Sequence, residues 1–342
     1  MISAGGAARR TRWPAARRAL ASLPLLLALA GCAGIQSALE PAGPNAREIA
    51  ILWWSMAVGA VLVLALVVGC LLYALLGHPE RQERITPHRL IVVGGIVLPV
   101  VVLSILVPFN VRVASGVTAP RGDDTLTIRI RGRQWWWDVE YDPGRLEGRF
   151  TTANEIYLPV GEPVELVLTT ADVIHSLWFP SLGGKLDMIP GRTNRLMIEA
   201  DRPGVYRGQC AEFCGVAHAK MALYAVAVPP EEFAAWAERQ LAPAEPPDGE
   251  REERGAALFD AGGCALCHTL RGRHAWGREG PDLTHVGGRL TIGAGLLDNA
   301  EAALAAWIAH NEAIKPGNRM PDYADLDGES LAALAAFLAG LE

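Results

Sequence analysis

The stretch Cys210-Ala-Glu-Phe-Cys214-Gly-Val-Ala-His218-Ala-Lys-Met221 places two thiols, an imidazole and a thioether within a dozen residues. Thiolate and thioether sulfurs are soft ligands that favour copper, and imidazole also binds copper well. Two thiolates four positions apart can bridge a pair of soft metal ions. The stretch therefore predicts a metal centre that carries electrons.

Two other interpretations of this stretch stay open. Cys210 and Cys214 can form a disulfide, or they can hold a structural zinc ion together with His218 and a fourth ligand. The flanking residues favour copper. His175 follows an apolar alternating run from which a strand can present it to the cysteines, and Met221 is a poor zinc ligand but a common weak axial ligand of copper.

A second cofactor motif, Cys264-Ala-Leu-Cys267-His268, has the spacing that attaches haem c through two thioether bonds and places a histidine on the iron. The segments Gly280-Pro281-Asp-Leu-Thr and Lys315-Pro-Gly-Asn-Arg-Met320-Pro321 resemble loops of a small class I cytochrome c. The resemblance implies that Met320 is the sixth iron ligand and that the carbonyl of Pro281 orients His268. Bis-histidine ligation is the alternative, but we interpret its candidates as surface or propionate-side residues: His274, His285 and His310.

The copper-ligand stretch and its surroundings resemble the CuA domain of cytochrome c oxidase subunit II. The resemblance covers residues 46–240 and includes the segments Gly132-Arg-Gln-Trp135-Trp-Trp137, Ser181-Leu-Gly-Gly-Lys185-Leu-Asp187-Met-Ile-Pro-Gly-Arg192 and Gly208-Gln-Cys210. It implies that Cys210 and Cys214 bridge two copper ions, that His175 and His218 each bind one, and that Met221 and the backbone carbonyl of Glu212 are weak ligands. The Glu212 side chain would face a magnesium ion shared with subunit I.

The same resemblance implies that electrons reach CuA through Trp135. The chain departs from the usual family pattern here, because Arg133 and Trp136 stand where histidine and tyrosine are common. A second departure concerns protons: Val92 stands where many family members carry a glutamate near a proton pathway. An apolar valine cannot relay a proton.

Length and composition indicate a membrane protein of several domains. The chain has 342 residues, of which 51% are hydrophobic, and its net charge of -6 argues against nucleic acid as a partner. Four of its six cysteines lie in the two cofactor motifs. This distribution argues against a disulfide framework.

The first residues have the features of an exported lipoprotein. Residues 1–31 combine a basic start with a short apolar run, as in a signal peptide. The sequence Leu29-Ala30-Gly31-Cys32 resembles a bacterial lipobox, which implies lipidation of Cys32. Ordinary signal cleavage nearby, or an uncleaved first span, is the alternative. Residues 32–48 then form an extracytoplasmic segment.

Two uncharged runs follow, and each is long enough to cross a bilayer as a helix. They occupy residues 49–77 and 90–111 and form a transmembrane hairpin. The connecting loop, residues 78–89, carries Arg81, Arg84 and Arg89, so the positive-inside rule places it in the cytoplasm. Both flanking regions then face outward.

Residues 120–241 show short alternating runs separated by turns, as in Leu126, Ile128 and Ile130, which predict a cupredoxin-like antiparallel β-barrel or sandwich. A short amphipathic helix at 231–241 closes this CuA domain. A polar, proline-bearing linker follows at 242–252. Residues 253–342 have the helical periodicity of a small all-α class I cytochrome c domain.

Taken together, these features make the chain similar to subunit II of a caa(3)-type haem-copper oxidase. The family implies that a reduced cytochrome c or a cytochrome bc complex supplies electrons, which pass through haem c and CuA to subunit I, where oxygen becomes water and protons are translocated. The expected partners are subunits I and III and the lipid of the bacterial inner membrane, with both cofactor domains on the periplasmic side. A CuA-type nitric oxide reductase and a membrane-anchored copper carrier are the alternatives.

Overall fold

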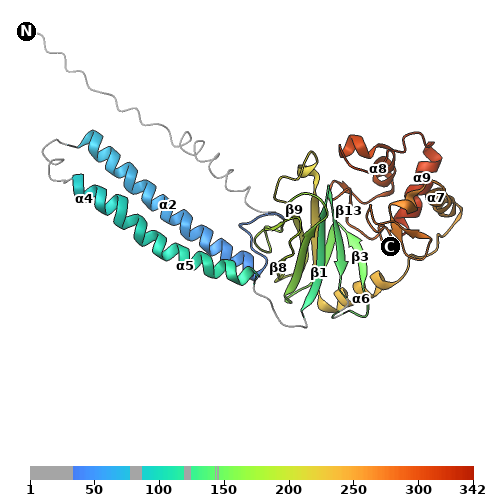
Figure 1. The fold of residues 1–342 in the computed structure, drawn as a ribbon, viewed down its shortest axis with the longest axis horizontal. Coiled ribbons are helices and arrows are strands. Elements are labelled where there is room, and N and C mark those ends of the chain that lie inside the picture. Colours follow the sequence, from blue (N-terminus) through green and yellow to red (C-terminus); the bar gives the residue numbers. More distant parts are fainter. Residues whose placement is uncertain (1–33, 78–86, 119–124, 143, 145) are drawn as a thin grey trace, which may run out of the picture.

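A computed structural model describes residues 34–77, 87–118, 125–142, 144 and 146–342 (Figure 1). The predicted signal peptide and the predicted lipidation site Cys32 lie outside the described residues, as does most of the predicted cytoplasmic loop.

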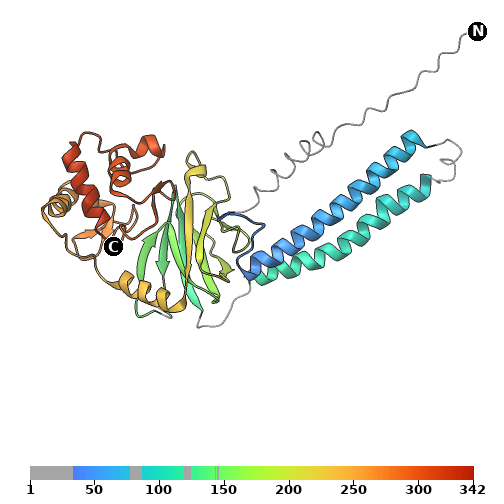
Figure 2. The same cartoon turned by 180° about the vertical axis from the view of Figure 1, so that it is seen from behind.

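Two long apolar helices run side by side and extend away from the rest of the molecule (Figures 1 and 2). The first, α2, spans Pro44–Leu76 and begins with a proline at its first turn, where no backbone donor is lost. The second begins as α4 (Pro87–Val92), passes through a π-helical segment (Val93–Val97) and continues as α5 (Leu98–Thr118). Both are long and apolar enough to cross a membrane, as the sequence predicts.

The central domain consists of two five-stranded sheets. Most neighbouring strands are antiparallel, but β1 pairs in parallel with β5, and β10 pairs in parallel with β4. The expected cupredoxin-like sandwich is therefore present, with mixed sheets in place of the purely antiparallel ones that we expected. In sheet order, the first sheet contains β3 (Phe150–Ala153), β2 (Trp136–Tyr141), β1 (Leu126–Arg133), β5 (Val164–Thr170) and β8 (Asn194–Ile198), and the second contains β4 (Glu155–Pro159), β10 (Ala222–Val228), β9 (Gly204–Cys210), β6 (His175–Trp178) and β7 (Leu186–Met188).

The core of the sandwich follows from the alternation of apolar residues. Leu126, Ile128 and Ile130 of β1 are each no more than 1% exposed, which confirms the period-two prediction for this strand. Helix α6 (Pro230–Leu241) covers one end of the sandwich, and its Trp236 stacks on Tyr157 with ring centroids 4.2 Å apart. The predicted closing helix is thus present.

The C-terminal domain is built from α7 (Glu250–Ala261), α8 (Glu301–Ile314) and α9 (Gly328–Ala339). Helices α7 and α9 pack through Phe259 and Phe337, which are both buried. The Asp327 side chain caps α9 by accepting a hydrogen bond from the Ser330 amide. Two short ladders add to the expected all-α architecture: β11 (Thr269–Leu270) with β12 (Ala275–Trp276), and β13 (Thr291–Ile292) with β14 (Leu297–Asp298).

The C-terminal domain lies directly against the sandwich (Figures 1 and 2). Several hydrogen bonds join the two domains. The Ala222 amide donates to the Ala294 carbonyl at 3.0 Å, and the Thr151 hydroxyl donates to Asp282 Oδ2 at 2.6 Å. These contacts hold the C-terminal domain against β10 of the second sheet and β3 of the first.

Candidate functional site

The sulfur-rich loop connects two paired strands of the second sheet. Strand β9 ends at Cys210, and β10 begins directly after Met221. The Cys210 amide donates to the Met221 carbonyl at 2.9 Å, so the two ends of the loop are held together. Strand β6 begins with His175 and pairs with β9 through Leu177 and Cys210. The pairing of β6 with β9 brings an imidazole from a distant part of the sequence next to the first cysteine.

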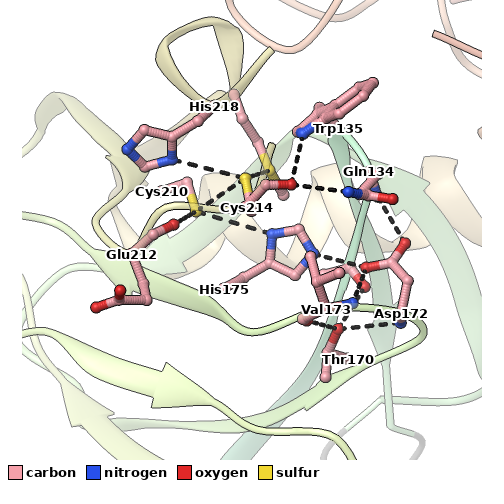
Figure 3. A network of polar contacts seen from close by, with 12 residues as sticks. Gln134, Trp135, Thr170, Asp172, Val173, His175, Cys210, Glu212, Cys214 and His218 are labelled. Atoms are coloured by element: carbon pink, nitrogen blue, oxygen red, sulfur yellow. Dashed lines mark hydrogen bonds and ion pairs between the residues drawn. The ribbon is translucent and has the colours of Figure 1, made fainter. Parts of the chain in front are cut away.

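The donor atoms of the loop and of His175 converge (Figure 3). Cys210 Sγ lies 3.7 Å from Cys214 Sγ and 3.8 Å from His175 Nδ1. Cys214 Sγ lies 3.6 Å from His218 Nδ1 and 3.9 Å from Met221 Sδ. All of these residues are buried except His218, which is half-buried. A disulfide bond is only about 2.05 Å long, so the disulfide alternative is wrong for Cys210 and Cys214, which are free thiols.

Glu212 contributes to this cluster through its backbone. Its carbonyl oxygen lies 3.2 Å from Cys210 Sγ, while its side chain points away from the sulfurs and is exposed (Figure 3). The backbone carbonyl of Glu212 therefore faces the sulfur atoms, while its carboxylate lies on the surface.

The ionisation of the two thiols indicates that the cluster suits a cation. The hydrogen bond between the sulfurs lowers the pKa of Cys210 to about 3 and raises the pKa of Cys214. Two thiols this close cannot both ionise readily in a buried site, because the like charges repel each other. A bound metal ion removes this penalty. Two thiolates, two imidazoles and a thioether match the ligand preferences of copper, so the residues present fit a copper centre.

Asp172 holds the imidazole of His175 in place, and the sequence alone did not identify it. Its Oδ1 accepts from His175 Nε2 at 2.8 Å, and its Oδ2 accepts from the Gln134 amide at 2.8 Å. Burial lowers the pKa of His175, but its contacts with Cys210 and Asp172 outweigh burial and leave that pKa raised. Because Nε2 is engaged by Asp172, Nδ1 is the nitrogen that faces the sulfurs.

Gly132 of β1 makes room for this imidazole. A Cβ atom at position 132 would lie 2.7 Å from His175 Cδ2, closer than packed carbon atoms approach. The glycine in the Gly132-Arg-Gln-Trp135 segment therefore permits the close packing of β1 against His175.

Trp135 lies beside the cluster and is 8% exposed. Its indole Nε1 donates to the Cys214 carbonyl at 3.0 Å, and the Gln134 side chain donates to the same oxygen at 2.8 Å. Both residues follow the end of β1 and contact the sulfur-rich loop directly (Figure 3).

The C-terminal domain contains a cavity of about 280 Å³ that is lined mainly by apolar side chains. Cys264, His268 and Met320 all line it, although Met320 lies more than fifty residues after the cysteine motif. Cys267 is exposed. An apolar cavity with a thiol, an imidazole and a thioether on its wall fits a haem with histidine and methionine ligands. The other lining residues are Leu258, Phe259, Ala261, Gly262, Leu283, Ile308, Tyr323, Leu326, Leu334 and Leu338.

The imidazole of His268 is oriented by the backbone. Its Nδ1 lies 2.7 Å from the Pro281 carbonyl oxygen, so Nε2 is the nitrogen that remains for iron. Burial lowers the pKa of His268, which favours the neutral ring that a metal requires.

None of the three histidines considered for bis-histidine ligation is among the residues that line this cavity. His274 and His310 are exposed, as we expected. The surface interpretation is wrong for His285, which is 6% exposed because its ring nitrogens contact the carbonyl oxygens of Ala242 and Glu342.

Comparisons with known proteins agree with both sites. Residues 144–228 match the family model for the periplasmic domain of cytochrome c oxidase subunit II, and residues 252–342 match the model for cytochrome c. Cytochrome c oxidase subunit 2 of Alkalihalophilus pseudofirmus is 35% identical over 96% of this chain and 98% of that protein. The Bacillus subtilis protein of the same name is 28% identical over 94% of this chain and 96% of its own length.

A solved structure covers part of the chain. The periplasmic domain of subunit II of cytochrome oxidase from Bradyrhizobium japonicum is 35% identical, with a TM-score of 0.33 over 36% of this chain and 96% of that one. Since the relatives extend over nearly the whole chain, and both domain families match in the expected order, the chain belongs to the cytochrome c oxidase subunit II family and carries a cytochrome c domain at its C-terminal end.

Proposed function

We propose that this chain is the electron-input subunit of a respiratory oxidase that reduces oxygen to water. In this proposal a reduced cytochrome c or a cytochrome bc complex delivers electrons to the cytochrome c domain, and they leave through the CuA site towards subunit I. Oxygen reduction and proton translocation belong to the assembled complex, with the oxygen site in subunit I. The observation that carries the proposal is the presence of two preformed ligand sets in one chain, with Trp135 hydrogen-bonded to the sulfur-rich loop.

Membership in the subunit II family implies a copper centre in the sandwich. We propose that it is binuclear and that Glu212 contributes its backbone oxygen to copper and its side chain to a magnesium ion at the boundary with subunit I. The exposure of the Glu212 side chain supports the second role. Held by these residues, such a copper centre would accept and release single electrons. The proposed ligands are His175, Cys210, Cys214, His218, Met221 and the Glu212 carbonyl.

The cytochrome c family match implies a haem c in the C-terminal domain. We propose that Cys264 and Cys267 attach it and that His268 and Met320 are its axial ligands. The shared cavity supports the axial pair, and the contact between Pro281 and His268 supports an orienting role for that carbonyl.

The two apolar helices and the family relationship indicate a membrane-anchored protein with an extracellular domain. We propose that the membrane is the bacterial inner membrane, that the cofactor domains are periplasmic and that subunit III completes the complex. We also propose domain limits at 120–241 and 253–342, with 242–252 as the linker. Lipidation of Cys32, outside the described residues, is a further proposal from the sequence.

The experiment is a comparison of the purified complex with its Cys214→Ser variant. The wild-type complex should take up oxygen with reduced cytochrome c as donor. The variant should still reduce its haem c but lose oxygen uptake, because one bridging sulfur is missing. Nitric oxide turnover without oxygen uptake would favour the nitric oxide reductase alternative. Copper loading without turnover of either gas would favour the copper carrier.

A further inference from the structure

Two lysines form hydrogen bonds across the boundary between the sandwich and the cytochrome c domain, one from each side. Lys220, in the sulfur-rich loop, donates to the Ile314 carbonyl of the cytochrome c domain at 2.6 Å. Lys315 follows Ile314 in the cytochrome c domain, and its Nζ donates to the Trp135 carbonyl of the sandwich at 2.6 Å. The C-terminal end of α8 is therefore held to the sandwich by two hydrogen bonds, one donated by each domain.

Lys315 is buried in an unusual way for a lysine. It is 3% exposed, and its Nζ also donates to the Gly293 carbonyl at 2.9 Å, so one ammonium group joins three segments of the chain. Burial lowers the pKa of Lys315 to about 7. Burying a cation is costly unless its donors find partners. The Trp135 and Gly293 carbonyls are such partners, and the two hydrogen bonds fix the position of this loop relative to the sandwich.

The loop that follows Lys315 packs on the indole of Trp135. Gly317 has a positive φ of 82°, and a Cβ atom there would lie 3.2 Å from Trp135 Cη2 and 2.8 Å from Val216 Cγ2. The same loop ends at Met320, which lines the haem cavity. On its other side, Trp135 donates to the Cys214 carbonyl at 3.0 Å. A continuous series of contacts thus leads from the haem cavity to the sulfur-rich loop.

We propose that Lys315 is a positioning residue for electron transfer between the haem c site and the CuA site, because it holds the Met320 loop against Trp135. The inference rests on the proposed function. With both groups bound, the haem c site would supply one electron and the CuA site would accept it, so no other reactant is needed. The rate of such a transfer falls steeply as the separation of the sites grows. Loosening the loop should therefore slow the transfer while both ligand sets stay intact.

Other contacts keep the domains together without Lys315. Thr151 bonds to Asp282, and the Leu290 amide donates to Glu155 Oε2 at 2.9 Å. Arg271 donates to the Gln240 carbonyl at 2.5 Å. None of these contacts involves Trp135 or the segment 315–320, so Thr151→Val is a matched control that removes one hydrogen bond between the domains elsewhere.

The test is flash reduction of haem c in the purified complex, followed by measurement of electron arrival at CuA. Lys315→Met should slow this step several-fold, because a loop that is no longer held against Trp135 leaves the two cofactor sites farther apart. Thr151→Val should keep the wild-type rate. The haem c reduction potential and the CuA paramagnetic resonance spectrum should be unchanged in both variants. Hydrogen exchange of the complex should show faster exchange of the 315–320 amides in Lys315→Met alone.

Two results would overturn the proposal: a wild-type rate in Lys315→Met, or equal slowing in Lys315→Met and Thr151→Val. If Lys315→Met does not assemble, Gly317→Ala displaces the same loop without touching the lysine and should also slow the step. A wild-type rate in Gly317→Ala would then overturn the proposal. A wild-type complex that shows no transfer from haem c to CuA would instead refute the proposed function.

Discussion

The ligands in the sulfur-rich stretch could be predicted because they are close in sequence and chemically distinctive. Cys210, Cys214 and Met221 come together within one loop, and His175 was identified by its place at a strand. Asp172 was not identified, although it lies only three residues before His175. A carboxylate before a strand is common, and only the folded geometry shows that it accepts from the imidazole.

We predict that Asp172→Asn weakens copper binding. The amide cannot reproduce the charge that orients His175, and loss of such a partner typically costs about 10- to 100-fold in metal affinity. Copper retention during dialysis against a graded series of chelator concentrations measures the change. Asp142→Asn, which removes a carboxylate that pairs with Arg129 and Arg149, is the matched control. Unchanged copper affinity in Asp172→Asn would show that the contact does not orient the ligand.

The strands and helices could be recognised from periodicity, but their pairing could not. Alternation identified β1 as a strand because it reports which face is buried. It carries no information on which strand lies next to which. The parallel pairing of β1 with β5 therefore came only from the structure. The pairing of β6 with β9, which brings His175 to Cys210, had the same origin.

In the cytochrome c domain, the contact between α7 and α9 should be essential for stability. Phe337 is 1% exposed and lies against Phe259, which also lines the haem cavity. We predict that Phe337→Ala destabilises this domain by about 3–5 kcal/mol, the usual cost of removing a large buried aromatic side chain. Urea unfolding followed by haem absorbance measures the loss. Phe213→Ala, at a side chain that is 75% exposed, should leave the unfolding midpoint where it is.

The domain order could be predicted from the motifs, but the contact between the domains could not. The polar linker predicted at 242–252 says nothing about how the domains meet, whereas the structure buries Glu155 and Lys315 where they meet. Charged residues in a sequence indicate a solvated surface, and nothing local distinguishes one that a neighbouring domain covers. The two domains contributing to the surroundings of Lys315 are therefore brought together only in the folded chain.

The burial of Glu155 predicts a pH dependence of stability. Burial raises the pKa of Glu155 above its usual 4.5. The folded state then holds a proton that the unfolded state has released, so this contribution to stability is complete below pH 4.5 and is lost as the pH rises through the folded pKa. Each unit of elevation corresponds to about 1.4 kcal/mol. The Glu155→Gln variant should show a weaker decline of the urea midpoint above pH 4.5. Equal slopes in the two proteins would show that Glu155 does not titrate in this way.

The proposed function requires a sulfur-bridged copper pair and a covalently attached haem in the same chain. Metal analysis of the purified complex, combined with near-infrared absorbance and paramagnetic resonance of the oxidised form, tests this. We predict a pair of copper ions and a single haem c for each copy of this chain, with a mixed-valence copper signal that Cys210→Ser abolishes. A fully metal-loaded chain that contains zinc, or that lacks both the near-infrared band and the mixed-valence signal, would contradict it.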